Sequence, residues 1–501
     1  MGLFTSKPDY SKIATKKNKQ KEQANPRPKW LDWAYMIVVM LLYLAFCYWV
    51  GSWWGLLVTP FIFDLYITKK IKWTWWKELE NPARAIMSWV DAIVFALVAV
   101  YFVTNFFFQN YKIPSSSLEK TLLTGDYLLV SKLSYGPRIP QTPLTLPLTQ
   151  HTIPMLNCKS YLDWPHWEYR RVKGLGTVKL GDIVVFNYPA GDTVAVDYPY
   201  DFYDLCYSLG SQIMQESGEQ LPPMYGQSTE AQMRQFYSVY TLGKNFVNSQ
   251  RNKYGQITVR PADRRENYVK RCVGLPGQTL EIRNKVVHID GKPIPQPELV
   301  QFNYALYTKN GQLLPDKLCA ELGISDEDRS RQLDRENGMP MTNAVREALL
   351  SHTELVDSIV EILDGYAGNL YPLDHDYGWT RDNYGPIYLP KKGQPVELTM
   401  ENIAFYERPI RAYEHNQLEV RDGKIFINGQ ETTSYTFKMD YYWMMGDNRH
   451  NSADSRYWGP VPEDHVVGKP LFVWISVSSD TNPDAPHWRW NRLFKWVSGI
   501  Q

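Results

Sequence analysis

"YKIPSSSLEKTLLTGDYLLV", residues Tyr111 to Val130, is the stretch around which this chain of 501 residues is organised. It follows an apolar run directly and places Ser115, Ser116 and Ser117 where a membrane helix would leave the bilayer. One interpretation is a hydroxyl-rich turn that caps the next element, a common use of serine. The other is that one of the serines is a nucleophile, which requires a base elsewhere in the chain.

Two apolar segments upstream of this stretch are long enough to cross a membrane. Residues 31–50 and 88–108 each approach the roughly 20 residues that span the hydrocarbon core. Residues 53–67 are shorter and contain Pro60 and Asp64, so their pattern leaves open whether they span the bilayer or dip into it. We predict a membrane anchor over residues 31–110 with two or three transmembrane helices.

Lysine clusters indicate how the anchor is oriented. Residues 16–21, "KKNKQK", and residues 69–77, "KKIKWTWWK", are both basic, and cytoplasmic flanks of membrane helices are enriched in Lys and Arg. If both clusters lie in the cytosol, residues 31–68 cross twice and the next helix carries the chain outward. We expect a multi-pass protein of the cytoplasmic (inner) membrane, with its body on the outer (periplasmic) face and residues 1–30 as a disordered basic cytosolic arm.

Downstream of Tyr111 the pattern changes to short apolar or alternating runs such as "DIVVFNY", residues 182–188. These runs predict antiparallel β structure, and "DGK" at 290–292 and 422–424 and "NGQ" at 428–430 are hairpin signals. The predicted fold class is therefore mainly β. It consists of an antiparallel β-sheet body with an inserted, partly helical subdomain, anchored by N-terminal transmembrane helices.

Two long segments interrupt the β pattern. Residues 198–267 are polar and aromatic without a clear period, whereas residues 317–365 are helical in character. Within them, residues 342–365 have apolar side chains near helical spacing up to a predicted stop at Asp364 and Gly365. We predict a body in three parts, residues 111–197, 268–300 and 401–501, with insertions at 198–267 and 301–400.

Composition and motifs exclude several classes of protein. The net charge is +1, so no global field favours nucleic acid as a partner. The five cysteines are odd in number and widely spaced, so they indicate neither a disulfide framework nor a zinc site. The chain has no GxSxG, HExxH, P-loop or GxGxxG pattern. A nucleophilic serine would need another kind of base, and we expect no metal and no cofactor.

Lys270, in "YVKRCVGLPG" (residues 268–277), is the strongest candidate for that base. Apolar neighbours on both sides predict a buried strand, where desolvation disfavours the ammonium and lowers the pKa of lysine. Bringing that pKa from about 10.4 to near 7 or 8 costs roughly 4 kcal/mol. A third stretch, "MMGDNRHNSADSRYWGPV" at 444–461, is dense with turn formers and charges and would suit a rigid loop that holds the amine in place.

These stretches together resemble bacterial type I signal peptidases, the membrane-bound Ser-Lys proteases. The serine stretch is similar to the nucleophile box of that family, "GDIVVF" (181–186) to the following strand, "YVKRCVGLPG" to the lysine box, and "GDNRHNSADSRYWGPVP" (446–462) to the C-terminal box. The four matches occur in family order and cover about a seventh of the chain. The inserted segments have no such support, and we assign them no chemistry.

The resemblance implies roles for particular residues. The family nucleophile falls on Ser117, the oxyanion-hole hydroxyl on Ser115, the general base on Lys270 and the lysine-orienting hydroxyl on Ser452. The charged residues that brace the site correspond to Asp447, Asp454, Arg456 and Arg271. The shallow apolar substrate pockets, which would favour Ala-x-Ala ends, correspond to Ile113, Pro114, Leu118, Leu122, Tyr268 and Val269.

The chain departs from the family pattern in two places. Glu119 and Lys120 replace the usual apolar residue and proline, which would change the shape of the pocket or the rigidity of the turn. His450 stands where an acidic residue is common; a Ser-His pair with Ser452 is one interpretation, but we favour a solvated loop histidine. Ser116 is interpreted as neutral.

The resemblance implies removal of signal peptides from exported preproteins, with Ser117 attacking and neutral Lys270 accepting its proton. Preproteins and membrane lipid are the expected partners, and the secretion translocon is a further candidate. A catalytically silent membrane-anchored β module that binds exported chains is the main alternative, and it predicts loss of Ser117 or Lys270, both of which are present. A protease that cuts itself or a regulator would show a cleavage pattern in its own linker, and we find none.

Overall fold

The computed structural model describes residues 28–156, 158–189, 193–195, 198, 201–363, 369–482 and 484–500. The chain divides into two compact units, Met1–Ala99 and Val100–Gln501. The predicted disorder of the N-terminal arm falls almost entirely on residues 1–27, which lie outside the described residues.

The apolar helices that the sequence predicts are α2 (Lys29–Val50), in the first unit, and α4 (Ala83–Phe106), which begins in the first unit and continues past Ala99. Both helices are long and apolar enough to cross a membrane, with mean hydropathies of 2.0 and 2.2. The segment between them, Trp53–Thr68, is shorter and is broken into η1 (Trp53–Val58), α3 (Thr59–Phe63) and η2 (Asp64–Thr68). The Asp64 carboxylate ends this segment by accepting hydrogen bonds from the backbone amides of Lys70 and Ile71.

An eight-stranded antiparallel sheet forms the centre of the second unit. Its strand order is β1-β2-β21-β3-β6-β19-β20, and β22 pairs with β21. The strands are β1 (Phe108–Lys112), β2 (Asp126–Ser131), β3 (Ile183–Asn187), β6 (Asn267–Gly274), β19 (Tyr441–Met445), β20 (Val461–Pro462), β21 (Val466–Ser476) and β22 (Lys495–Trp496). The antiparallel β body predicted from the sequence is confirmed.

The central strand β3 of this sheet is buried on both of its faces. Along β3, Ile183 and Val185 pack into one hydrophobic cluster, whereas Val184 and Phe186 pack into another on the opposite face. Successive side chains of a strand point to opposite faces, so a continuously apolar strand is stable only where both faces are covered. This double burial explains why the sequence of β3 is apolar without alternation.

A second, separate sheet has the order β13-β7-β8-β9, and its strand β7 follows β6 along the chain. It contains β7 (Thr279–Arg283), β8 (Val286–Ile289), β9 (Lys292–Pro293) and β13 (Tyr384–Tyr388). A third antiparallel group lies on a separate core and contains β14 (Pro395–Glu397), β15 (Leu418–Arg421), β16 (Lys424–Ile427), β17 (Gln430–Glu431), β18 (Ser434–Thr436) and α11 (Ile403–Arg408).

The three predicted hairpin turns are confirmed. Asp290-Gly291, Asp422-Gly423 and Asn428-Gly429 each join two paired strands, and all six residues have φ between 51° and 80°. Two consecutive positive φ values define the turn that matches the twist of antiparallel strands, and Asp, Asn and Gly tolerate them best.

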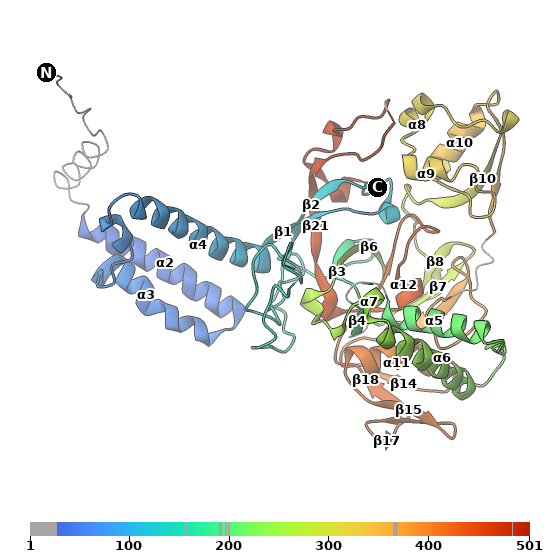
Figure 1. Cartoon of the computed structure of the whole chain (residues 1–501), viewed down its shortest axis with the longest axis horizontal. Coiled ribbons are helices and arrows are strands. Elements are labelled where there is room, and N and C mark those ends of the chain that lie inside the picture. Colours follow the sequence, from blue (N-terminus) through green and yellow to red (C-terminus); the bar gives the residue numbers. More distant parts are fainter. Residues whose placement is uncertain are drawn as a thin grey trace. The chain divides into compact units, whose positions relative to one another are not determined.

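The first insertion folds as a pair of antiparallel helices, which its sequence pattern did not predict. α5 (Phe202–Glu216) and α6 (Thr229–Ser249) lie side by side (Figure 1), followed by α7 (Arg251–Tyr254) and flanked by the short strands β4 (Thr193–Ala195) and β5 (Ile257–Val259). Gly210 and Gly243 allow the close approach, because a Cβ on either would collide with a backbone carbonyl of the other helix.

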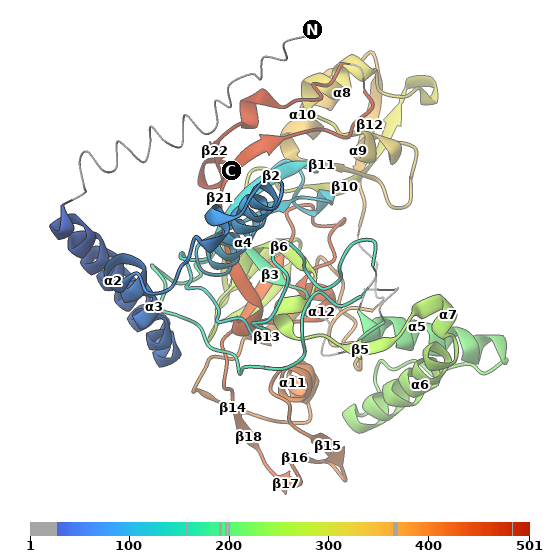
Figure 2. The same ribbon diagram turned by 60° about the vertical axis from the view of Figure 1, so that its left-hand side comes forward.

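The second insertion forms a lobe of its own, which we call the inserted lobe (302–361). It contains β10 (Phe302–Thr308), α8 (Asp316–Leu322), α9 (Asp326–Ser330), β11 (Met339–Met341), α10 (Asn343–Ser351) and β12 (Val356–Glu361) around a single hydrophobic cluster (Figure 2). The prediction of one helix up to residue 363 is wrong, because residues 356–361 pair with β10 as a strand. Val356, Ile359 and Val360 are β-branched and suit a strand once β10 offers an edge. The predicted stop at Asp364 and Gly365 lies outside the described residues.

Candidate active site

Ser117 lies in a buried turn between β1 and β2. Ser116 to Leu118 form one turn of 3-10 helix, and Ser115 precedes it in an extended conformation with φ −138°. Leu118 and Leu122 anchor the turn in the hydrophobic cluster beneath it. Ser117 is only 8% exposed, whereas Ser115 is exposed.

The amine of Lys270 reaches Ser117 from β6. Lys270 Nζ lies 2.5 Å from Ser117 Oγ, within hydrogen-bond distance, and Lys270 is 3% exposed. Burial lowers the pKa of Lys270 to about 8, and the nearby carboxylates of Asp454 and Asp447 oppose that shift only in part. A substantial fraction of this amine is therefore neutral near pH 8, as a general base requires.

The loop after β19 ties two segments together: the turn Ser116–Leu118, which we call the nucleophile turn after the role predicted for Ser117, and β6, which contains Lys270. Asp447 accepts a hydrogen bond from Thr121 Oγ1 at 2.8 Å and two from Arg271, from Nε at 2.8 Å and Nη2 at 2.7 Å. The backbone amide of Asn448 donates to the carbonyl of Ser117 at 3.1 Å. Gly446 permits this approach, because a Cβ there would collide with the Ser117 carbonyl.

A second buried ion pair holds the same loop from the other side. Arg456 donates to both carboxylate oxygens of Asp454, at 2.9 and 2.8 Å, and both residues are almost fully buried. Burial disfavours the Asp454 carboxylate, but Arg456, the Gly446 amide and Lys270 together outweigh that effect, and the pKa of Asp454 is lowered. Asp454 also accepts from the amide of Gly446 at 3.1 Å. The four residues predicted to brace the site thus form two Arg-carboxylate pairs beside it.

Ser452 and the predicted pocket residues lie in different surroundings. Ser452 is buried, and among the described residues its hydroxyl donates to the carbonyl of Ala453 at 3.5 Å rather than to Lys270. The predicted pocket residues divide between two clusters. One cluster, beneath Ser117, contains Ile113, Leu118, Leu122 and Val269. Tyr268 packs against the cluster on the opposite face of β3, and Pro114 is exposed.

The inserted lobe contacts the nucleophile turn, and this contact was not predicted. Ser116 Oγ donates to Glu327 Oε1 of α9 at 2.7 Å, and Asn451 Nδ2 donates to Ser116 Oγ at 3.1 Å. Lys120 donates to the carbonyl of Gly323. Ser116 and Glu327 are 211 positions apart, and no local signal in the sequence links them.

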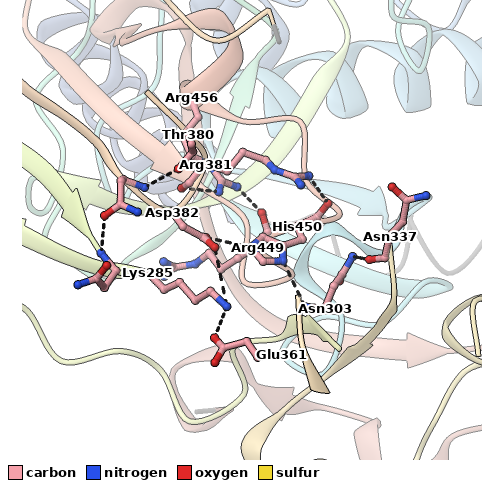
Figure 3. Close-up of polar contacts among 12 residues, drawn as sticks. Lys285, Asn303, Asn337, Glu361, Thr380, Arg381, Asp382, Arg449, His450 and Arg456 are labelled. Carbon is pink, nitrogen blue, oxygen red and sulfur yellow. Dashed lines mark hydrogen bonds and ion pairs between the residues drawn. The ribbon is translucent and has the colours of Figure 1, made fainter. Parts of the chain in front are cut away.

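The prediction of a solvated loop histidine at 450 is wrong. His450 is 8% exposed and lies between Asp382 and Asn303 (Figure 3). The amide of Asn303 donates to Nδ1 at 3.2 Å, so Nε2 carries the proton and donates to Asp382 Oδ1 at 2.9 Å. Both ring nitrogens are thereby occupied, which also excludes the alternative of a Ser-His pair with Ser452. The histidine instead joins the C-terminal loop to β10 and to the segment before β13.

The described residues contain no group of three or more His, Cys, Asp or Glu side chains placed to hold a metal ion. Each cysteine is a free thiol, and four of them are buried. What the site does contain is a buried hydroxyl, a buried amine with a lowered pKa, and two ion pairs that hold their loops together. Such a site can deprotonate a serine and carry out acyl transfer.

Comparison with known proteins identifies related sequences. A model of the family described as signal peptidase, peptidase S26, matches residues 86–331 and 392–475, well over half of the chain. The chain is 21% identical over 405 residues to a signal peptidase I of Buchnera aphidicola subsp. Baizongia pistaciae, covering 81% of this chain and 78% of that protein.

Two further relatives match over shorter regions. A signal peptidase I of Haemophilus influenzae is 30% identical over 129 residues, which covers 22% of this chain and 37% of the relative. The chloroplastic thylakoidal processing peptidase 1 of Arabidopsis thaliana is 38% identical over 84 residues, covering 14% of this chain and 24% of the relative.

Proposed function

This chain belongs to the signal peptidase family, peptidase S26, and is therefore a peptidase; from that premise we propose that it removes N-terminal signal peptides from exported preproteins with a Ser-Lys dyad. Ser117 is the proposed nucleophile and Lys270 the proposed general base. The observation that carries the proposal is the 2.5 Å separation of Lys270 Nζ and Ser117 Oγ in a buried site.

The proposed reaction is an acyl transfer. Ser117 Oγ attacks the scissile carbonyl while neutral Lys270 takes its proton, and the amide of Ser117 with the hydroxyl of Ser115 stabilises the oxyanion. Ser117 stands in the first turn of a helix, where amides have no intrahelical acceptor. Lys270 then protonates the leaving amine and activates the water that releases the acyl-enzyme.

The residues that brace the site are proposed to act indirectly, by holding Lys270 in place and by controlling the charge around it. Arg271 and Arg456 each neutralise the carboxylate that would otherwise favour the protonated form of Lys270. Ser452 is proposed to orient the lysine, which requires its hydroxyl to rotate away from Ala453. Ile113, Pro114, Leu118, Leu122, Tyr268 and Val269 are proposed to shape pockets that accept small substrate side chains.

We propose that the catalytic unit works at the outer face of the cytoplasmic membrane. Ser117 follows the end of α4 by 11 positions, so the nucleophile is tethered near the bilayer if α4 spans it. Substrate preproteins carry their own apolar segment in the same membrane, which lowers the entropic cost of the encounter. Membrane lipid and the secretion translocon are the proposed partners besides preproteins.

The dyad is tested by cleavage of a purified preprotein in neutral detergent. Ser117→Ala and Lys270→Ala are expected to lose at least about a thousandfold in rate, because the nucleophile and the base act as a unit. Exposed residues provide the matched controls Ser434→Ala and Lys438→Ala, which should cleave like wild type. Comparable product from all variants would remove the dyad assignment, and no product from wild type would favour a silent binding module.

A further inference from the structure

A cavity of about 780 Å³ lies in the second unit, outside the site of Ser117 and Lys270. Residues of β3, β6, β8 and β21, the loop residues 180–182 and 294–298 and the C-terminal stretch 496–500 line it, together with the loop residue Arg449. Its volume is within the range of pockets that bind small molecules, roughly 300–1,000 Å³.

Arg449 is the unusual member of this lining. It is 3% exposed, yet among the described residues its guanidinium makes no hydrogen bond or ion pair, and its Nε is buried without an acceptor. The backbone of Arg449 is held by two hydrogen bonds. Its amide donates to the carbonyl of Gln301 at 3.0 Å, and its carbonyl accepts from Arg456 Nη2 at 2.6 Å. No dashed contact reaches its guanidinium in Figure 3.

The other charges of the lining do not neutralise Arg449. Arg271 is paired with Asp447, Lys469 is paired with Asp182 at 2.5 Å, and Glu298 is exposed to solvent. Burial lowers the pKa of Arg449 to about 10, and Asp447 compensates for it only partly. Burying an unpaired cation is costly, and an anion bound beside the guanidinium would relieve that cost.

Apart from Gln296 and Ser498, the uncharged part of the lining is formed mostly by apolar side chains. Ile183, Val273, Val497 and Ile500 are buried, and Leu471 and three prolines add to the same surface. Among the described residues of the lining, Arg449 Nε is the one buried side-chain nitrogen or oxygen that lacks a hydrogen-bond partner. A peptide would bring backbone groups that need partners, whereas an acyl chain would not. Trp496, which lines the cavity and is 61% exposed, extends the apolar surface outward.

We propose that this cavity binds an amphiphile with one carboxylate or phosphate head on an acyl chain. The head pairs with the guanidinium of Arg449, whose planar donors match either group, and the chain lies along the aliphatic lining toward Trp496. The head of the ligand supplies a negative charge that pairs with Arg449, and the acyl chain excludes water from the apolar wall.

Binding is tested on the full chain in dodecyl maltoside, a neutral detergent, by calorimetric titration with dodecyl phosphate and with dodecanoate. Wild type should show one saturable site for each probe. Arg449→Gln should bind at least tenfold more weakly, which corresponds to about 1.4 kcal/mol. Arg283→Gln, at an exposed arginine, is the matched control and should bind like wild type. Equal affinity in wild type and Arg449→Gln, or only non-saturating partition into micelles, would overturn the proposal.

A second variant covers the case in which Arg449→Gln does not fold. Ser498 lines the cavity at an exposed position, so Ser498→Trp should fill the space, leave the fold intact and abolish the saturable site. Unchanged binding in this variant would place the site elsewhere. Inorganic phosphate alone separates the two sources of an anion: it should bind far more weakly than dodecyl phosphate, and equal affinity would refute the acyl chain.

Discussion

The amine of Lys270 carries the proposed chemistry at the scale of single residues. It lies on a strand buried on both faces, and the two carboxylates near it are each held by an arginine. A free carboxylate at either position would stabilise the ammonium and raise the pKa of Lys270. The two ion pairs therefore neutralise carboxylates that would otherwise favour the protonated form of the proposed base.

The rate of cleavage should follow the ionisation of this amine. The base acts when it is neutral, so kcat/KM should rise with pH and level off above about 8, the pKa of Lys270 in the folded protein. An unperturbed lysine would give a rise that continues to about 10.4. Initial rates on a soluble peptide ending in Ala-x-Ala, measured from pH 6 to 10, provide the profile. A tenfold increase per pH unit beyond pH 9 would contradict the prediction.

Glu119 should make stability depend on pH. Burial first, and then Asp328, raise the pKa of Glu119 from 4.5 to about 7. The folded state thus binds more protons than the unfolded state between these values, and stability falls as pH rises through that range. At pH 8, Glu119→Gln should increase the free energy of unfolding by up to about 3 kcal/mol and raise the thermal midpoint accordingly. At pH 5 the substitution should change the thermal midpoint little.

The control for this prediction is Glu401→Gln, at an exposed carboxylate. Melting of both variants at the two pH values separates the effect of Glu119 from a general effect of charge. Equal midpoint changes at pH 5 and pH 8 would show that Glu119 is not the group responsible.

At the scale of elements, α9 connects the inserted lobe to the nucleophile turn. Glu327 accepts the hydrogen bond of Ser116, the neighbour of Ser117, and Asn451 of the C-terminal loop shares the same hydroxyl. The turn is therefore held by two segments that are distant from it in sequence, α9 and the C-terminal loop. The inserted lobe thereby contributes to the position of the proposed nucleophile.

Removal of this contact should slow the chemical step. A hydrogen bond to a charged group contributes about 1.5–3 kcal/mol, so Glu327→Ala should lower kcat roughly tenfold with little change in KM. Ser116→Ala should act similarly, and the double variant should be no worse than either single one, because both remove the same interaction. Full additivity of the two effects would refute the coupling. Glu321→Ala, at an exposed carboxylate of α8, is the control.

At the scale of the whole molecule, the chain combines an apolar unit with a catalytic one. Cys158 is exposed in the catalytic unit, whereas Cys47, Cys206, Cys272 and Cys319 are buried. The natural sequence therefore contains one accessible thiol that reports which side of the membrane the catalytic unit occupies.

Labelling with an impermeant maleimide tests the proposed orientation. Cys158 should react in intact cells whose outer membrane has been permeabilised, and Cys158→Ser should abolish the signal. Adding Thr74→Cys to Cys158→Ser places a thiol at an exposed position of the basic loop, which should react only in inverted vesicles. The reverse pattern would place the catalytic unit in the cytosol.

The sequence by itself determined the features that depend on local pattern. Apolar length alone predicts α2 and α4, and Asp-Gly and Asn-Gly pairs predict the hairpin turns, because these properties depend on residues a few positions apart. Motif order was sufficient to nominate Ser117 and Lys270, which the structure brings to 2.5 Å.

Only the tertiary structure decided which distant residues meet. Residues 356–361 became a strand because β10 presents an edge to them, and α5 and α6 form where two glycines let one helix cover the other. His450 is buried because Asp382 and Asn303 satisfy its ring, and Glu327 reaches Ser116 across 211 positions. Burial and hydrogen bonding depend on partners that only the folded chain brings together, so no local pattern could reveal them.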